Sequence, residues 1–386
     1  MDKRQALLIP VTFGIAFFLG VESGGFQLIL LQVAEEFSLD PVMMGTLVTS
    51  QFFAICLGPL VFGWISDRIG KKPVLLISMI LFVIGCFGAS LSPTVLFFSS
   101  AVFTLGLGFS VSECIGSSLL SDSFPGRESN YLNFMQGGFS LGAVISPLVF
   151  SRLIQADLVS WRAVFLAAGV GYLLIYPLLI FSKITQPGKE KTEVKLVLPS
   201  TSEQKVFSSF FIVLFFSMMV CVAVEAGIGY FADSLFVTEY GNLELGAYAI
   251  SGFWFSMAVS RFLFSRIKMK PRTMVMTGFL LICLSLIVSL PFRNPYIMLV
   301  SFFFLGTASG PIWPMIIGIG ASLNQKRSGT NTSILYAAGG LGGIIIPVLI
   351  GLVAERQGFY NSFWLLCIFA AAGFLLMWLG TREKKS

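Results

Sequence analysis

The chain has 386 residues, of which 56% are hydrophobic and 11% are charged, and its formal net charge is +6. Soluble domains carry roughly 25% charged residues, so this composition excludes a protein whose surface mostly faces water. We therefore expect a membrane protein, and we expect its positive charge to mark one side of the membrane rather than a nucleic-acid partner.

Long apolar runs separated by short polar breaks follow one another along the chain. A membrane-crossing helix needs about 20 apolar residues, and a helix satisfies its own backbone hydrogen bonds in lipid. The runs predict an all-α membrane protein with twelve transmembrane helices, at residues 6–31, 42–66, 73–91, 94–120, 131–154, 162–182, 206–236, 246–264, 272–290, 295–319, 330–353 and 361–380.

The polar breaks divide the basic residues unevenly between the two predicted sides of the membrane. The side that holds both termini also holds the breaks near residues 67–72, 127, 183–205, 266–272 and 326–327, where most of the Lys and Arg residues lie. Basic residues concentrate in cytoplasmic loops. We therefore expect a multi-pass protein of the cell inner (cytoplasmic) membrane with both termini in the cytoplasm.

The longest polar break, residues 183–205, is rich in Lys, Pro and Ser. Such a composition predicts a flexible linker, here on the cytoplasmic side. It divides the chain into an N-terminal six-helix bundle over residues 1–182 and a C-terminal six-helix bundle over residues 206–386.

The two halves resemble each other at a period of about 200 residues. Glu22 in the first predicted span matches Glu225 in the seventh, and Gly142 in the fifth matches Gly342 in the eleventh. Matches in the same order at nearly one offset predict two pseudo-symmetric bundles. In transporters built this way the substrate site lies near the bilayer midplane between the repeats, and rocking of the halves gives alternating access.

The loop between the second and third predicted spans carries glycines, one acid and basic residues at fixed spacing, namely Gly63, Asp67, Arg68, Gly70, Lys71 and Lys72. We expect Gly63 to permit close packing and Gly70 a tight turn. The loop resembles the G-x-x-x-D-R-x-G-R/K-R/K signature of the major facilitator superfamily. The resemblance fits the whole chain and implies the major facilitator fold, with these six residues in its conformational switch.

A narrower resemblance is to the proton symporters of fucose and of glucose and mannose. The stretch LGLGFSVSECIGSSLL is similar to their G-x-G-x-x-x-E pattern, which implies that Glu113 is the proton-linked acid. The stretch LNFMQ is similar to their L-N-x-x-Q pattern, which implies that Gln136 contacts the sugar. Where the fucose branch has an aspartate in the first span, this chain has Gln27, so whether one or two acids carry the proton stays open.

Three glutamates lie inside predicted spans, where an ionisable side chain is costly and marks a functional site by default. Glu113 has no basic residue within a helical turn, which suits reversible protonation. Glu22 would share the proton or bind the solute, and Glu225 would bind solute hydroxyls or a cation. The alternatives are a permanently neutral Glu113 bonded to a neighbouring helix, and helix packing at the small residues around Glu22.

Amides and indoles inside the spans suit sugar recognition, because an amide both donates and accepts hydrogen bonds and an indole stacks on an apolar face. The candidates for binding the substrate are Gln27, Asn133, Gln136, Trp254 and Trp313. Interhelical bonding and packing are the alternative roles. Arg261 lies near a span end, where we expect it to reach the cytoplasmic surface or to make a structural pair.

The sequence carries no nucleophile elbow, P-loop or dinucleotide fingerprint, and it has no histidine. We therefore expect neither an enzyme nor a metal or cofactor site. The main hypothesis is secondary active transport: proton-coupled uptake of a small neutral solute, a monosaccharide, by a monomer in the lipid bilayer.

Proton-coupled efflux of drugs or organic cations is the alternative function, because the predicted cavity helices carry acids and few basic groups. A transporter-like sensor or assembly partner is a third hypothesis. A carrier of organic anions is not expected, because no Lys or Arg lies deep in a predicted span.

Overall fold

The computed structural model describes residues 7–124, 128–182, 209–265, 269–323 and 328–382, and the regular secondary structure of these residues is helical. The elements are α2 (Leu8–Glu36), α3 (Pro41–Ile69), α4 (Lys71–Ser90), α5 (Val95–Ser123), α6 (Glu128–Gln155), α7 (Arg162–Phe181), α8 (Ser209–Tyr240), α9 (Leu243–Ser265), α10 (Pro271–Ser289), η1 (Leu290–Phe292), α11 (Pro295–Ser309), α12 (Ile312–Leu323) and α13 (Ser328–Arg382). The linker predicted at 183–205 lies outside the described residues.

Capping side chains determine where several helices begin. The Asp40 carboxylate accepts a hydrogen bond from the Met43 N–H at 2.7 Å, just before Pro41 opens α3. Thr94 caps α5 and Asn294 caps α11 in the same way. Such caps satisfy backbone donors that the first turn of a helix leaves free, so these short connections tie one helix closely to the next.

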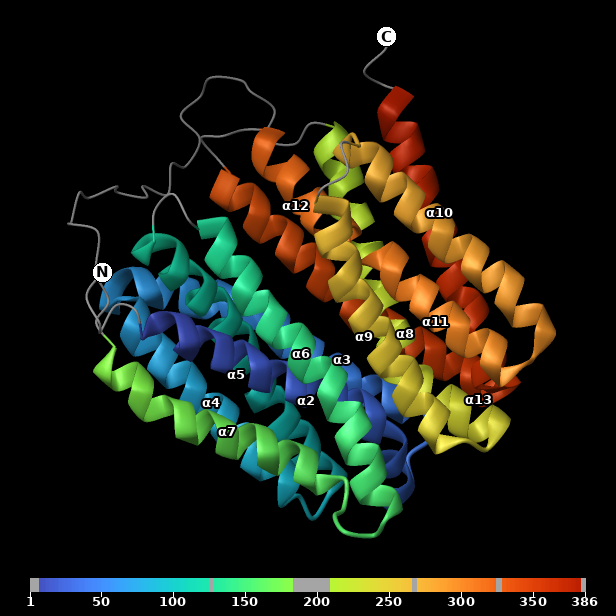
Figure 1. Cartoon of the computed structure of the whole chain (residues 1–386), viewed down its shortest axis with the longest axis horizontal. Helices are drawn as coiled ribbons and strands as arrows, with labels where there is room; N and C mark the ends of the chain where they lie inside the picture. Colours follow the sequence, from blue (N-terminus) through green and yellow to red (C-terminus); the bar gives the residue numbers. More distant parts are fainter. Residues whose placement is uncertain (1–6, 125–127, 183–208, 266–268, 324–327, 383–386) are drawn as a thin grey trace.

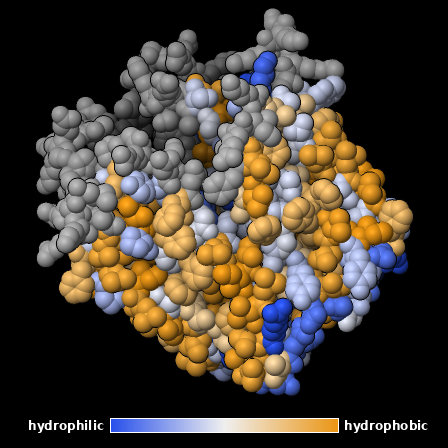
Figure 2. Space-filling model, viewed as in Figure 1, coloured by the Kyte–Doolittle hydropathy of each residue, from blue (hydrophilic) through white to orange (hydrophobic). Residues whose placement is uncertain are grey.

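Ten helical stretches in the described residues are long and apolar enough to cross a membrane. The predicted span 295–319 is interrupted where α11 ends at Ser309 and α12 begins at Ile312. The predicted spans 330–353 and 361–380 both lie in α13, whose backbone leaves helical geometry at Gly358 (φ 82°, ψ 160°). Apolar residues cover much of the outer surface, as expected for helices that face lipid (Figure 2).

The helices form two groups that follow the chain (Figure 1): α2 to α7 gather on one side and α8 to α13 on the other. We name the ends of this bundle by their charge. The basic end holds Arg68, Lys71, Lys72, Lys270 and Arg272, and the opposite end holds the turns at 37–40, 91–94, 156–161 and 241–242.

The internal repeat is visible in equivalent close helix contacts. A side chain at Gly142 of α6 would collide with the Phe17 carbonyl of α2. At the matching place in the second half, a side chain at Gly342 of α13 would collide with the Met219 carbonyl of α8. Both glycines therefore let two backbones approach closely, which is how small residues stabilise helix pairs in membranes.

The two halves also meet along a seam between α3 and α13. The backbone of α13 at Pro347 lies against Gly45, and the Thr49 hydroxyl donates to the Ile344 carbonyl at 2.8 Å. On the other side of the bundle the Ser251 hydroxyl of α9 donates to the Val144 carbonyl of α6 at 2.9 Å. These contacts lie between the opposite end and the middle of the helices, so they hold the two halves together there.

The predicted switch loop lies between α3 and α4 at the basic end. Gly70 has a φ of 92°, which confirms the predicted turn. Among the described residues, nothing lies within 4 Å of a side chain placed at Gly63, so the close packing expected there stays a prediction. Lys71 donates to the Ser118 hydroxyl, and Lys72 donates to the Ser182 carbonyl at 2.7 Å. The Asp67 side chain lies outside the described part of the chain.

Candidate functional site

A buried hydrogen-bonded chain crosses from the first half to the second. Glu22 of α2 is fully buried, and one of its carboxylate oxygens accepts from the Gln51 amide of α3 at 3.0 Å. The Gln51 carbonyl accepts from the Tyr230 hydroxyl of α8 at 2.7 Å. The second Glu22 oxygen has no partner among the described residues. Glu22 is therefore linked to the second half of the molecule through the side-chain amide of Gln51.

Gln27 and Trp254, both predicted from the sequence, meet directly. The Trp254 indole N–H of α9 donates to the Gln27 amide oxygen of α2 at 2.9 Å. Gly229 of α8 lies against the Gln27 amide, and a side chain there would overlap it. The Phe139 ring of α6 lies edge-on to Trp254 at 5.5 Å between centroids. This pair therefore joins the halves in the interior of the bundle.

We call these residues the amide layer, which consists of Glu22, Gln27, Gln51, Tyr230 and Trp254. Tyr230 is not among the residues predicted from the sequence. The signal available for it is its place five residues after Glu225, in the stretch VEAGIGYF at residues 224–231.

Glu113 and Gln136, to which the narrower resemblance gave separate roles, are hydrogen-bonded to each other. The Gln136 amide of α6 donates to a Glu113 carboxylate oxygen of α5 at 3.2 Å. Both side chains are partly exposed, in contrast to the fully buried Glu22. The side chain of Asn133, predicted beside them, lies outside the described residues. Glu113 thus has one polar partner and an open side, an arrangement that permits proton exchange with water.

Arg261 contacts the interior rather than only the surface. Its Nε donates to the Gly310 carbonyl at 3.2 Å. Its guanidinium interacts electrostatically with Glu113 of the first half and with Glu225 of the second. Neither acid has a basic neighbour within its own helix, so only the packing of α9 against the bundle reveals this cation. Arg261, which the sequence places near a span end, is therefore within electrostatic range of an acid of each half.

Glu225 and Trp313, both predicted from the sequence, complete the group of residues around Glu113 and Arg261. Glu225 of α8 accepts a weak hydrogen bond from the Cys221 thiol at 3.7 Å. Trp313 of α12 packs edge-on against Tyr336 of α13, with 5.1 Å between ring centroids. Tyr336 in turn interacts electrostatically with Glu113. We call this group the acid layer, which consists of Glu113, Gln136, Glu225, Arg261, Trp313 and Tyr336.

Metal binding finds no support in the part of the chain that the structure describes. No cluster of three or more Cys, Asp and Glu residues is close enough there to hold an ion. The acids of the two layers face amides, a phenol and a guanidinium instead, which suits proton exchange and hydrogen bonding to a polar solute.

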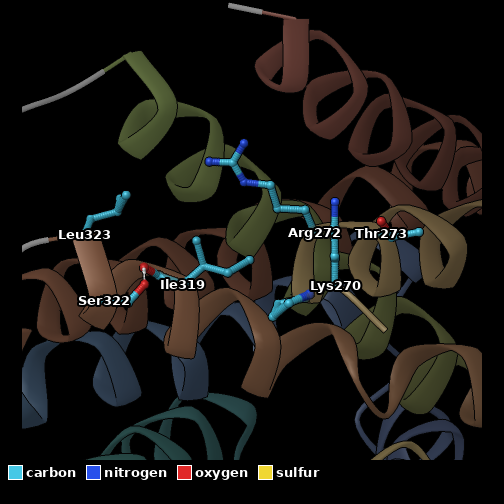
Figure 3. Close-up of a pocket in the computed structure, with 7 residues that line it drawn as sticks. Lys270, Arg272, Thr273, Ile319, Ser322 and Leu323 are labelled. Atoms are coloured by element: carbon cyan, nitrogen blue, oxygen red, sulfur yellow. Dashed lines mark hydrogen bonds between the residues drawn. The ribbon is translucent and has the colours of Figure 1, made fainter. Parts of the chain in front are cut away.

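A pocket of about 550 Å³ opens at the basic end, and none of its lining residues belongs to either layer. Figure 3 shows the side chains that line it. It lies between the first residues of α10 and the last residues of α12. Its lining includes Lys270, Arg272 and Ser322. Arg272 also lies over the Phe210 ring at 3.6 Å. This pocket is basic and superficial, so we do not place the transport site there.

Comparison with solved structures supports the same arrangement of helices. A bacterial homolog of the human lysosomal transporter Spinster, in an inward-facing and occupied conformation, superposes with a TM-score of 0.79 at 13% identity over 99% of this chain and 98% of that chain. The same homolog in its unoccupied conformation has a TM-score of 0.78. At this identity the likeness shows a shared fold.

Two curated relatives match this chain along most of their length, and a third matches it along about half. The MFS-type transporter YfkL of Bacillus subtilis is 25% identical over 356 residues, which is 90% of this chain and 89% of that protein. The protein TsgA of Shigella flexneri is 23% identical over 86% of this chain and 84% of its own length. The 4-hydroxybenzoate transporter PcaK of Acinetobacter baylyi is 28% identical over 53% of this chain and 46% of its own length.

The family model described as Major Facilitator Superfamily matches residues 12–267 and 214–386, which together span nearly the whole chain. The sequence match, the fold and the transporter relatives agree. This chain is therefore a multi-pass membrane protein that belongs to the Major Facilitator Superfamily and acts as a secondary transporter.

Proposed function

We propose that this transporter couples the uptake of a small neutral solute, of the monosaccharide class, to the entry of protons. The observation that carries the proposal is the Glu113–Gln136 hydrogen bond in the interior, beside the Trp313 and Tyr336 rings. A carboxyl group with one amide partner can release and take up a proton. Amides and aromatic rings around it bind hydroxyl groups and the apolar face of a sugar ring.

In this mechanism Glu113 carries the proton and Gln136 binds both Glu113 and the solute. Glu225 and Trp313 contact the solute from the second half. The amide layer closes the site toward the opposite end of the bundle, where Trp254 of the second half is hydrogen-bonded to Gln27 of the first half. Glu22 is the candidate for a second proton, because one of its oxygens is buried without a partner among the described residues.

The proposed topology has twelve crossings, arranged as six-helix bundles over residues 1–182 and 206–386 joined by the linker 183–205. The 55 residues of α13 would extend about 80 Å as one helix, far more than the roughly 30 Å core of a bilayer. The break at Gly358 allows two crossings instead. With α9 as a further crossing, both termini lie on one side, which the basic residues assign to the cytoplasm.

Uptake into proteoliposomes tests the proposal directly. The purified monomer is reconstituted, an inward proton gradient is imposed, and a panel of labelled monosaccharides is offered. We expect one or more sugars to accumulate above equilibrium and the accumulation to collapse with a protonophore. Equal sugar levels with and without protein, for every sugar of the panel, would contradict the proposed substrate class.

A small organic anion is the second candidate substrate. The observation that favours it is the electrostatic contact of Arg261 with both Glu113 and Glu225, because a guanidinium in the interior can bind a carboxylate bidentately. One relative is named a 4-hydroxybenzoate transporter. Uptake of labelled 4-hydroxybenzoate by the same liposomes, lost in Arg261→Gln, would favour this candidate over the neutral solute.

A further inference from the structure

Asp233 of α8 is a buried acid that neither layer of the site uses. Its exposed fraction is 0%, and neither of its carboxylate oxygens has a hydrogen-bond partner among the described residues. The adjacent Ser234 hydroxyl is also buried without a partner among the described residues. An isolated carboxylate in such a place would cost many times the free energy of an ordinary buried polar group, so this burial favours the neutral carboxylic acid over the carboxylate.

The position of Asp233 on α8 directs it toward the first half of the molecule. Gly229 lies against Gln27 of α2, and the Tyr230 ring contacts the Phe26 ring of α2 at 5.6 Å. Asp233 is four residues beyond Gly229, about 40° further around the helix axis, and so lies between the directions of Gly229 and Tyr230. The face of α8 that carries Asp233 is therefore the face that packs on the other half.

The packing around Asp233 excludes a compensating charge. On α9, a Cβ at Gly246 would lie 2.6 Å from Asp233 Oδ1, so the α9 backbone closes directly over the carboxyl group. On α2, the charged group that interacts with Asp233 is Glu35, which is itself an acid. The acid in the first turn of α9, Glu244, is exposed. Of the described elements around Asp233, none brings a basic side chain into interaction with it.

We propose that Asp233 is a further proton-binding residue of the transport cycle, protonated when the opposite end of the bundle is closed and ionised when that end opens to water. Opening moves α2 away from the face of α8 that carries Asp233, so that water reaches the carboxyl group beside α9 and solvates the carboxylate. Each closure binds one proton at Asp233 and each opening releases it. By linkage, acid stabilises the closed opposite end and alkali opens it.

This proposal rests on the rocking of the two halves in the proposed function, but it depends neither on the identity of the solute nor on Glu113. The test therefore uses the full-length protein without any solute. A failure of sugar uptake would leave its result unchanged, so the two proposals fail separately.

The first measurement is the infrared absorption of protonated carboxylic acids in protein labelled with [4-¹³C]aspartate. We expect a band of a protonated aspartic acid in the wild type that is lost in Asp233→Asn. The matched control is Asp157→Asn, an exposed aspartate at the same end whose positive φ of 53° asparagine tolerates. This control should keep the band. Absence of the band in the wild type would overturn the proposal, whether or not the variant folds.

The second measurement is hydrogen–deuterium exchange of residues 22–36 and 233–250, corrected for the intrinsic effect of pH. Exchange should rise from mildly acidic to mildly alkaline pH in the wild type and in Asp157→Asn, and should stay low in Asp233→Asn. A pH response of Asp233→Asn equal to that of the wild type would overturn the proposal. Exchange that falls as the sodium concentration rises at fixed pH would also overturn the proposal, because Asp233 would then bind a cation rather than a proton.

Discussion

The Trp254 indole donates a hydrogen bond of 2.9 Å to the Gln27 amide across the boundary between the two halves of the molecule. The Tyr230 hydroxyl makes a second such bond, to Gln51, at 2.7 Å. Both bonds join the halves between the middle of the bundle and the opposite end. Any rocking motion that opens the opposite end must break them, so they are part of the closed state.

Removing these bonds should open the opposite end. A neutral hydrogen bond contributes about 0.5–1.5 kcal/mol, so Trp254→Phe or Tyr230→Phe should lower the closed-to-open ratio between about twofold and tenfold. Spin labels at Leu158 and Phe292, both exposed at the opposite end, would report this as a larger population of long distances. Tyr296→Phe, which removes an exposed hydroxyl at the same end, should leave the distances unchanged.

Glu113→Gln should uncouple transport from protons while leaving the solute pathway intact. Glutamine keeps the size and the hydrogen-bonding capacity toward Gln136 but cannot release a proton. We expect loss of gradient-driven accumulation, with counterflow exchange of the same solute retained. The control is Glu355→Gln, which neutralises an exposed acid at the opposite end. Retained accumulation in Glu113→Gln would assign the coupling proton to another acid.

Gly342→Ala should destabilise the second half. The added methyl group would collide with the Met219 carbonyl, and overpacking of this kind costs about 1–3 kcal/mol. Gly318→Ala is the matched control on a neighbouring helix, because a side chain there meets nothing within 4 Å and alanine favours the helix by up to about 1 kcal/mol. Thermal unfolding in detergent should show a lower midpoint for Gly342→Ala alone; equal midpoints would contradict the close packing of α8 and α13.

Glu36→Gln should weaken the opposite end of the first half. Glu36 accepts two hydrogen bonds from Arg162, at 2.5 and 2.6 Å, and one from the Trp161 indole at 2.7 Å. Because the ion pair is partly exposed, we expect a loss of about 1 kcal/mol in the free energy of unfolding. The neighbouring exposed acid Glu35 serves as the control, and an equal effect of Glu35→Gln would show that charge alone, not this geometry, matters.

The amino-acid sequence by itself determined the membrane class and the repeat, and it selected the candidate site residues. Apolar run length predicts spans because the bilayer thickness sets how many residues a helix needs. The match of Gly142 with Gly342 predicted equivalent places in the two halves, and both glycines lie against a helix backbone. The resemblance marked Glu113 and Gln136 as candidates, and the structure shows that they are hydrogen-bonded.

Only the tertiary structure decided which interior groups meet across the bundle. Gln27 and Trp254 are 227 residues apart in the chain, and Arg261 reaches Glu113 from another half of the molecule. Composition and spacing describe one helix at a time, whereas these contacts depend on the depth and rotation of helices that pack from different parts of the chain. Asp233 lies near the end of the predicted span 206–236, but only the packing of α9 against α8 shows that its carboxyl group is fully buried.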